Sequence, residues 1–241
     1  MKKAIIFFLG LMASNFAFAD ALGFRVEAGI WQYEPSGSIR DSANVSDSFD
    51  ISSELGYKED DVFNGVVYFE HPIPILPNFR VGSTDLSLSG TGTIAAGKNW
   101  NGTPVPAGSV TSSVDLSHTE IGLYYEIIDV GFDFDLGVNA KIFDGTANIE
   151  TATSSFSETI PMLYGHLGVP LAGGFKVLGD MSYISLDGDT FSDYNIRLRW
   201  DSGVMVGVSA GYRSLTIDYE DGNEVIDAKF DGPFVNATLT F

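Results

Sequence analysis

The sequence predicts an all-β protein: a transmembrane antiparallel up-and-down β-barrel of ten strands, with eight strands as the alternative. First, apolar and polar residues alternate without a break from Val235 to Phe241, which is the period of a β-strand. Second, no apolar stretch after Asp20 approaches the length of a membrane-spanning helix, so a closed barrel is the remaining structure that spans a bilayer. Third, long connections between strand-like segments alternate with short ones, as in membrane barrels.

The first 19 residues have the three parts of a secretory signal peptide. Met1-Lys2-Lys3 is positively charged, the stretch from Ala4 to Met12 is apolar, and Ala17-Phe18-Ala19 is a small-x-small cleavage site. The apolar stretch is too short for a retained membrane helix. We therefore expect cleavage after residue 19 and assign residues 20–241 to the barrel.

Composition narrows the classes of function. Without Lys2 and Lys3 the chain has 11 basic and 32 acidic side chains, a net charge of −21. This balance argues against nucleic acid as a partner, because such binding depends on basic groups that neutralise phosphates. The chain has no Cys, so neither lipoprotein acylation nor a disulfide framework is expected.

Five strands are expected in the first part of the chain, at 22–34, 60–71, 79–91, 113–128 and 131–145. A long polar stretch follows the first strand, a proline-rich turn the second, and a loop rich in Gly, Thr and Asn the third. Asp129-Val130 turns directly from the fourth strand into the fifth. The fifth has the cleanest alternation, with one apolar face formed by Phe132, Phe134, Leu136, Val138, Ala140 and Ile142.

Five more strands are expected after it, at 158–169, 175–186, 191–201, 204–219 and 228–241. The connections that precede them are a Ser/Thr-rich loop at 146–157, turns at 170–174 and 201–203, and acidic connections at 187–189 and 220–224. Long loops thus follow the odd strands and short turns the even ones. An even strand count returns both ends of the barrel domain to one side. The eight-strand alternative requires two segments, first of all the short ones at 158–186, to be loops.

In a membrane barrel the apolar face of each strand meets lipid and the polar face lines the lumen. Besides His118 and His166, the predicted lumen face carries six basic and six acidic residues: Arg25, Glu27, Glu120, Glu126, Asp133, Asp135, Lys141, Lys176, Asp180, Arg197, Arg199 and Arg213. Opposed charges in so narrow a barrel should pair, because an unpaired buried ion costs several kcal/mol. We favour a salt-bridged plug. The alternative is a narrow channel for small polar solutes, although a selective pore more often has a ring of one sign.

Candidate catalytic residues are few, and no enzyme activity is expected. The histidines are His71, His118 and His166, and His118 alone is placed near the outer end of its strand. Its neighbour Ser117 points to the opposite face of that strand, so the two form no nucleophile and base pair. An acyl hydrolase or protease is the enzymatic alternative.

The acidic connections are the second candidate. Carboxylates gather in the first loop, among them Asp47, Asp50 and Glu54, and again at 218–224. Such oxygens suit Ca²⁺ or Mg²⁺, and divalent ions could be shared with anionic lipopolysaccharide. The segment 218–224 lacks the full spacing of a calcium loop, so the favoured interpretation is that these loops are solvated. We predict neither a metal site nor a cofactor.

The final strand, with Leu239 and the terminal Phe241, resembles the closing strand of bacterial outer-membrane barrels. In those proteins the terminal aromatic residue is part of the signal read by the barrel-assembly machinery. Together with the turn 71–78 and the pair Gly173-Gly174, it resembles an uncharacterised family of proteobacterial outer-membrane proteins named for a glycine–glycine pair. The resemblance implies a barrel in a Gram-negative outer membrane, surrounded by lipid and lipopolysaccharide. It implies no catalytic residues. The expected role is structural or surface interaction, with the narrow channel as alternative.

Overall fold

The computed structural model describes residues 22–73 and 75–241, and the predicted signal peptide at 1–19 lies outside them. The strands are β1 (Gly23–Asp41), β2 (Phe49–Asp50), β3 (Asp60–Glu70), β4 (Asn78–Thr84), β5 (Ser87–Ile94), β6 (Lys98–Trp100), β7 (Thr103–Val105), β8 (Gly108–Asp115), β9 (His118–Asp129), β10 (Asp133–Ile149), β11 (Ala152–Pro170), β12 (Phe175–Leu186), β13 (Asp189–Asp201), β14 (Val206–Asp221) and β15 (Glu224–Thr240). Two short 3-10 turns are η2 (Val45–Asp47) and η3 (Ala172–Gly174). Among the described residues, no helix has the length and apolar character needed to cross a membrane.

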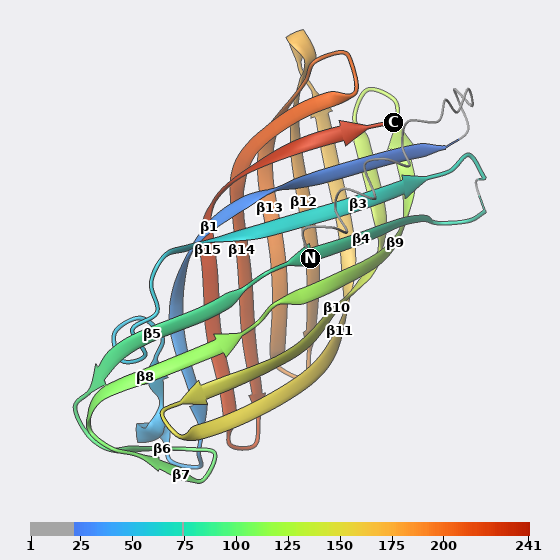
Figure 1. Ribbon diagram of the computed structural model, residues 1–241. Coiled ribbons are helices and arrows are strands. Elements are labelled where there is room, and N and C mark those ends of the chain that lie inside the picture. The colour runs from blue at the N-terminus through green and yellow to red at the C-terminus, as the bar shows by residue number, and fades with distance from the viewer. Residues whose placement is uncertain (1–21, 74) are drawn as a thin grey trace, which may run out of the picture.

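Ten strands close into one antiparallel ring (Figure 1), which confirms the predicted strand number. The order around the ring is β1, β3, β4, β9, β10, β11, β12, β13, β14 and β15. β15 pairs back onto β1 from Arg25↔Thr240 to Asp41↔Glu224. Phe241 extends this closure, because its backbone exchanges two hydrogen bonds with Phe24 at N to O distances of 2.8 and 3.3 Å. The final strand therefore seals the barrel.

Both described chain ends and four short turns lie at one end of the barrel, which we call the terminal end (Figure 1). The opposite end is the distal end. The terminal turns are described at 71–73 with 75–77, 130–132, 171–174 and 202–205. In the third of these, Gly173 and Gly174 have φ angles of 76° and 83°. Glycine adopts such positive values without strain, as expected for this pair.

The distal connections differ from the prediction. The loops expected at 146–157, 187–189 and 220–224 are two-residue turns at 150–151, 187–188 and 222–223, each between long strands. The segments next to these turns resemble loops because their outward residues are mostly Ser, Thr, Asn and Asp. Their inward residues nevertheless keep the alternation of a strand, as Ala147, Ile149 and Phe156 show. The expectation of long loops after the odd strands is wrong for these three hairpins.

The polarity of each wall face reverses halfway along the barrel. On β10 the outward residues are apolar from Phe134 to Ile142 and polar beyond it, at Asp144, Thr146 and Asn148. The inward residues change in the opposite sense. Lys141 is 1% exposed and faces the lumen, and the next inward residue, Phe143, is 3% exposed. The predicted polar lumen face is therefore correct for the terminal half and wrong for the distal half.

The same reversal occurs on other strands. On β15, Phe230 and Phe234 point inward in the distal half, whereas Val235 and Leu239 point outward in the terminal half. The outward apolar side chains of the terminal half form a band that we call the apolar belt: Ile30, Phe63, Leu123, Leu136, Val138, Ile142, Leu163, Leu167, Met181, Ile196, Leu198, Val208, Val235 and Leu239.

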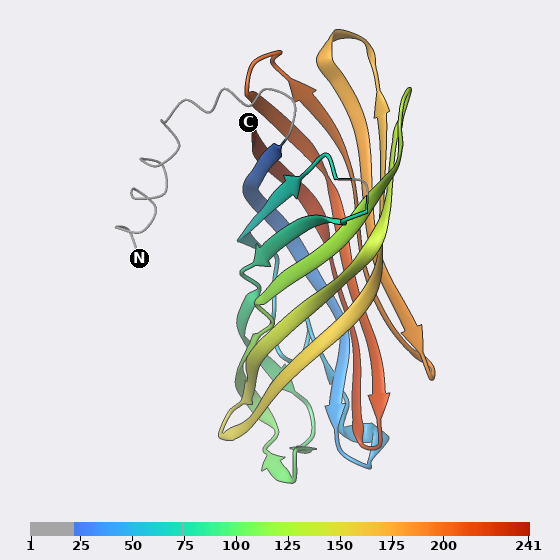
Figure 2. The same ribbon diagram turned by 90° about the vertical axis from the view of Figure 1, so that its right-hand side faces the viewer.

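In the distal half the ring divides into two sheets (Figure 2). The predicted third and fourth strands each break there, into β4 and β5 at residues 85–86 and into β8 and β9 at 116–117. Pairing between β11 and β12 ends at Leu163↔Tyr183. One group of paired strands then contains β5, β8, β10 and β11, and the other β12, β13, β14, β15, β1 and the distal residues of β3. Both contribute to one apolar core, which includes Trp31, Tyr33, Leu88, Val110, Phe143, Ile149, Phe191, Leu215, Ile217, Ala228, Phe230 and Phe234.

The first loop folds into this core rather than outward. Phe49, Ile51 and Leu55 are between 0% and 3% exposed. The segment passes so close to the inner face of β5 that a Cβ added at Gly92 would lie 2.0 Å from the carbonyl oxygen of Glu54. The ammonium of Lys98 holds the Glu54 carboxylate at 2.6 Å. The first loop is thus an internal plug of the distal half.

We expect Gly92→Ala to displace the segment 49–57 from the distal lumen, because the new methyl group overlaps the Glu54 carbonyl. The overlap should lower the free energy of unfolding by about 1–3 kcal/mol. Limited proteolysis of the folded protein in detergent should then show new cleavage within residues 42–59. The control is Gly179→Ala, where the nearest atom to the added Cβ lies 3.7 Å away. Unchanged proteolysis of the Gly92 variant would contradict the inward course of the loop.

Candidate functional site

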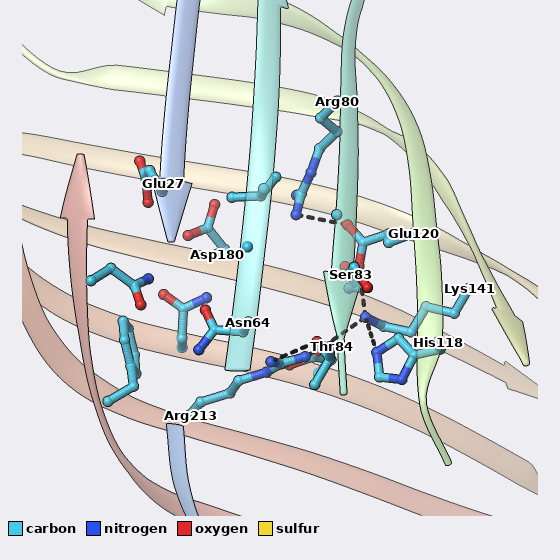
Figure 3. Close-up of a pocket in the computed structure, with 18 of the residues that line it drawn as sticks. Glu27, Asn64, Arg80, Ser83, Thr84, His118, Glu120, Lys141, Asp180 and Arg213 are labelled. Carbon is cyan, nitrogen blue, oxygen red and sulfur yellow. Dashed lines mark hydrogen bonds and ion pairs between the residues drawn. The ribbon is translucent and has the colours of Figure 1, made fainter. Parts of the chain in front are cut away.

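The candidate site is a cluster of charged side chains in the lumen of the terminal half. They come from strands all around the ring. They meet in the lumen because each occupies an inward position in its strand's alternation. Figure 3 shows Arg80, Glu120, Lys141, His118 and Arg213 extending into a common space. Burial is extensive: Glu27 is 2% exposed and Arg197 4%.

One chain of alternating charges runs across the lumen from β4 to β14. Arg80 contacts Glu120 at 2.7 Å, and Glu120 contacts Lys141 at 2.6 Å. Lys141 continues to Asp193 at 2.8 Å. Asp193 then accepts two hydrogen bonds from the Arg213 guanidinium, at 2.9 and 2.7 Å. Each inner member therefore has an oppositely charged partner on both sides, which offsets the cost of burying it.

A second group of charges is centred on Glu27 and Asp180. The Glu27 carboxylate has three guanidinium neighbours, with N to O distances of 3.4–3.6 Å from Arg25, Arg197 and Arg199. Arg197 also pairs with Asp180. Asp180 accepts a further hydrogen bond from the Tyr164 hydroxyl at 2.9 Å and contacts His166 Nδ1 at 2.8 Å. Both oxygens of this carboxylate therefore have a donor partner.

Three tyrosine rings, which we call the tyrosine layer, pack among these charges in the terminal half, where Tyr68 is paired in register with Arg25. Tyr68, Tyr124 and Tyr164 are between 1% and 3% exposed and pack edge to face, with centroids 6.4 and 6.0 Å apart. The Arg25 guanidinium lies 4.0 Å from the Tyr68 ring centre, and that of Arg80 lies 4.3 Å from Tyr164. Such cation–π contacts hold rings and charges together.

A cavity of about 90 Å³ remains between the charges. Asn64, Ser182 and Asn236 contribute to its wall, along with the charged groups. On its distal side the apolar core begins at Trp31, whose ring lies 4.5 Å from the Arg213 guanidinium. The volume suits a few water molecules.

The structure brings together most of the twelve charged residues expected in the lumen. Ten take part in ion pairs: Arg25, Glu27, Glu120, Asp133, Lys141, Lys176, Asp180, Arg197, Arg199 and Arg213. The contact between Lys176 and Asp133 is a looser one of 3.6 Å at the terminal rim, where both side chains are about one third exposed. Asp135 and Glu126 form no ion pair with the described residues. Asp135 is buried, whereas Glu126 is exposed.

Three central residues were missed from the sequence. Asp193 joins Lys141 to Arg213, Arg80 binds Glu120, and Glu70 accepts a hydrogen bond from Tyr124 at 3.0 Å. Strand parity could have found Asp193, because it shares a face with Arg197 and Arg199. No such signal marks the tyrosine layer, since tyrosine is also expected on the outer face of a barrel.

The histidines and acidic connections form no metal centre in the part of the chain that the structure describes. No group of three or more His, Asp or Glu side chains there is arranged to hold a metal ion. Asp50 instead accepts hydrogen bonds from the side chains and backbone of Ser53 and Ser52. These bonds, first those of Ser53, lower the pKa of its carboxyl.

Comparison with known proteins gives likenesses of fold alone. No family model matches the chain, and no curated protein does. Among solved structures, the chain is similar to Neisserial surface protein A, with 12% identity, 90% of this chain and 97% of that chain covered, and a TM-score of 0.39. It is similar to Ail of Yersinia pestis, with 12% identity, 92% and 99% coverage and a TM-score of 0.37. It is also similar to the translocator domain of NalP from Neisseria meningitidis, with 14% identity, 89% of this chain and 88% of that chain covered, and a TM-score of 0.42. The resemblance to the glycine–glycine family stays a prediction.

Replacing the central ammonium tests the ion-pair chain. Lys141→Ala leaves the buried carboxylates of Glu120 and Asp193 facing each other, so we expect a loss of about 3–5 kcal/mol in the free energy of unfolding. Lys176→Ala at the rim is the matched control and should cost less than about 1 kcal/mol, because that pair is partly solvated. Urea titration of the folded protein in lipid vesicles measures both. Equal losses would contradict a buried, mutually dependent chain of charges.

Proposed function

We propose that this protein is an integral barrel of a bacterial outer membrane, with its terminal half in the bilayer and its distal half outside the cell. The apolar belt supplies the lipid-facing surface that a membrane barrel requires. Aromatic side chains lie outward at its margins, where such rings prefer to sit. Tyr125, Phe132, Phe175, Trp200 and Phe241 lie at the terminal margin, and Tyr183, Tyr194 and Tyr212 at the distal margin. The terminal end then faces the periplasm, where Phe241 can meet the barrel-assembly machinery.

The lumen of this barrel is blocked, and the protein acts as a structural or surface-interaction protein. The observation that carries this proposal is the filling of the lumen in both halves of the barrel. A solute entering from the terminal end meets the tyrosine layer and the paired charges packed together, and then the apolar core with the first loop folded into it. Passage would break buried ion pairs, at several kcal/mol for each charge exposed without its partner.

A narrow channel for small polar solutes is the second candidate. The polar cavity of about 90 Å³ beside Lys141 and Asp193 favours it, since it leaves room for water among the charges of the described lumen. Conduction requires the tyrosine layer and the first loop both to move. We rank the channel second for this reason.

Catalysis is not part of the proposal. His118 directs Nδ1 toward the carbonyl of Leu116 at 3.0 Å and packs on Phe143, with ring centres 4.7 Å apart. The hydroxyl of Ser117 contacts the Asp85 carboxylate instead, at 3.2 Å. Ser117 and His118, the pair considered for an acyl hydrolase or protease, therefore contact different neighbours, as expected for adjacent residues on opposite faces of a strand.

Planar-bilayer recording separates the two candidates. A blocked lumen predicts no stable single-channel steps for the mature protein over a wide range of applied voltage. A protein with residues 49–57 replaced by a short Gly/Ser linker should still show none, because the tyrosine layer and the ion pairs remain. Stable steps in the unaltered protein, with a conductance changed by Arg197→Ala or Asp135→Ala, would refute the block and favour the channel.

A further inference from the structure

The wall of the distal half has a gap next to β5. The ladder between β3 and β4 runs to Asn64↔Thr84 and is extended by the backbone bond from Asp85 to Phe63. Beyond this point β5 pairs with β8 alone among the described strands. The distal residues of β3 likewise pair with β1 on one side only. Two strand edges therefore diverge from Phe63 without a strand between them.

A groove of about 310 Å³ occupies this gap. Residues 56–60 form one wall and residues 88–91 of β5 the other, and Tyr33 contributes to the floor. Tyr33 lies outside the apolar belt, and burial, followed by the nearby Asp60 carboxylate, raises the pKa of its phenol. The phenol is therefore a neutral group. One wall is the edge of β5 and the other is the irregular segment 56–59 that leads into β3. The two walls approach each other again at Gly56, where an added Cβ would lie 2.4 Å from the Thr91 carbonyl oxygen.

The charge around the groove selects the kind of segment that fits. Glu59, Asp60 and Asp61 are exposed beside it, against one exposed base, Lys58. The outward side chains of β5 along the groove, Ser89 and Thr91, are small and uncharged. A positively charged strand is attracted to this rim, because opposite potentials steer association. A second copy of this chain is disfavoured, since the net charge after signal removal is −21.

The groove also lies beyond the belt. Ile30 and Phe63 are the most distal outward apolar residues of β1 and β3, and Gln32 and Asp61 follow them toward the distal end. The amide of Gln32 donates to the Glu59 carboxylate at 2.9 Å. An anionic lipid headgroup would face this acidic rim, so a lipid is a poorer occupant than a cationic peptide.

We infer that the free edge of β5 docks an extended, positively charged peptide segment, which adds as a strand in the gap between β5 and β3. Main-chain hydrogen bonds to the β5 edge supply affinity, and the acidic rim supplies selectivity, as in other cases of strand addition. This inference rests on the surface-interaction role proposed above and names its partner class.

The test uses the mature protein in detergent micelles and a peptide of alternating Lys and Val with blocked ends. We expect saturable binding by calorimetry and slower hydrogen exchange of the backbone amides in Ser87–Ile94. The same peptide with alternate amides N-methylated should bind at least about tenfold more weakly, because each lost main-chain hydrogen bond costs about 1 kcal/mol. A peptide with Glu in place of Lys should not bind.

Two variants locate the binding. The double variant Asp60→Lys with Asp61→Lys should weaken binding of the Lys peptide about tenfold or more, because it reverses the charge of the rim. Asp144→Lys, an exposed acidic position on β10, is the matched control and should leave binding unchanged. Absent binding, equal binding of the N-methylated peptide, or unaltered exchange in β5 would overturn the inference. The bilayer recordings test the blocked lumen independently of these binding experiments, so the two proposals can fail separately.

Discussion

The structure depends on one constraint: the solvent outside the wall changes partway along strands that continue through both environments. In the proposed orientation the terminal half faces hydrocarbon and the distal half faces water. A strand exposes alternate residues to opposite sides, so the polarity of each face is set by what that face meets. On β10 the outer face becomes polar after Ile142 and the inner face becomes apolar at Phe143, and β15 repeats this double reversal.

The two interiors then need different means of stabilisation. Polar side chains in the terminal lumen have no bulk water around them, so charge is matched to charge and to tyrosine hydroxyls. In the distal half the interior is apolar, and the ring opens into two sheets that pack on a common core. The first loop adds Phe49, Ile51 and Leu55 to this core. Lys141 and Phe143, two residues apart on one face, mark the boundary between the two kinds of interior.

Strand number and lumen-facing parity could be predicted from the sequence, because both depend on local alternation. The strand from Asp133 onward is the clearest case. The ends of the distal strands could not, since Ser and Thr on an exposed strand face look like a loop, and the few inward apolar residues near Ile149 and Phe156 were a weak signal.

The partners of the charges were also beyond the sequence. Lys141 on β10 meets Asp193 on β13 across the lumen, and no spacing along the chain encodes a contact between strands that are not neighbours. The inward course of the first loop is similarly hidden, because its polar residues dominate the composition of 35–59. Only Gly90 and Gly92 on β5 mark its path, and a glycine pair in a strand has several explanations.

The reversal of polarity is tested most directly by cysteine substitution along the outward face of β10, since the chain has no native Cys. Intact outer membranes carrying Val138→Cys, Asp144→Cys or Thr146→Cys would be treated with a polar, membrane-impermeant maleimide. Rapid labelling at 144 and 146 with protection at 138 is the predicted result. Equal labelling at all three positions, or protection of all three, would contradict a wall that passes from lipid into water near Ile142.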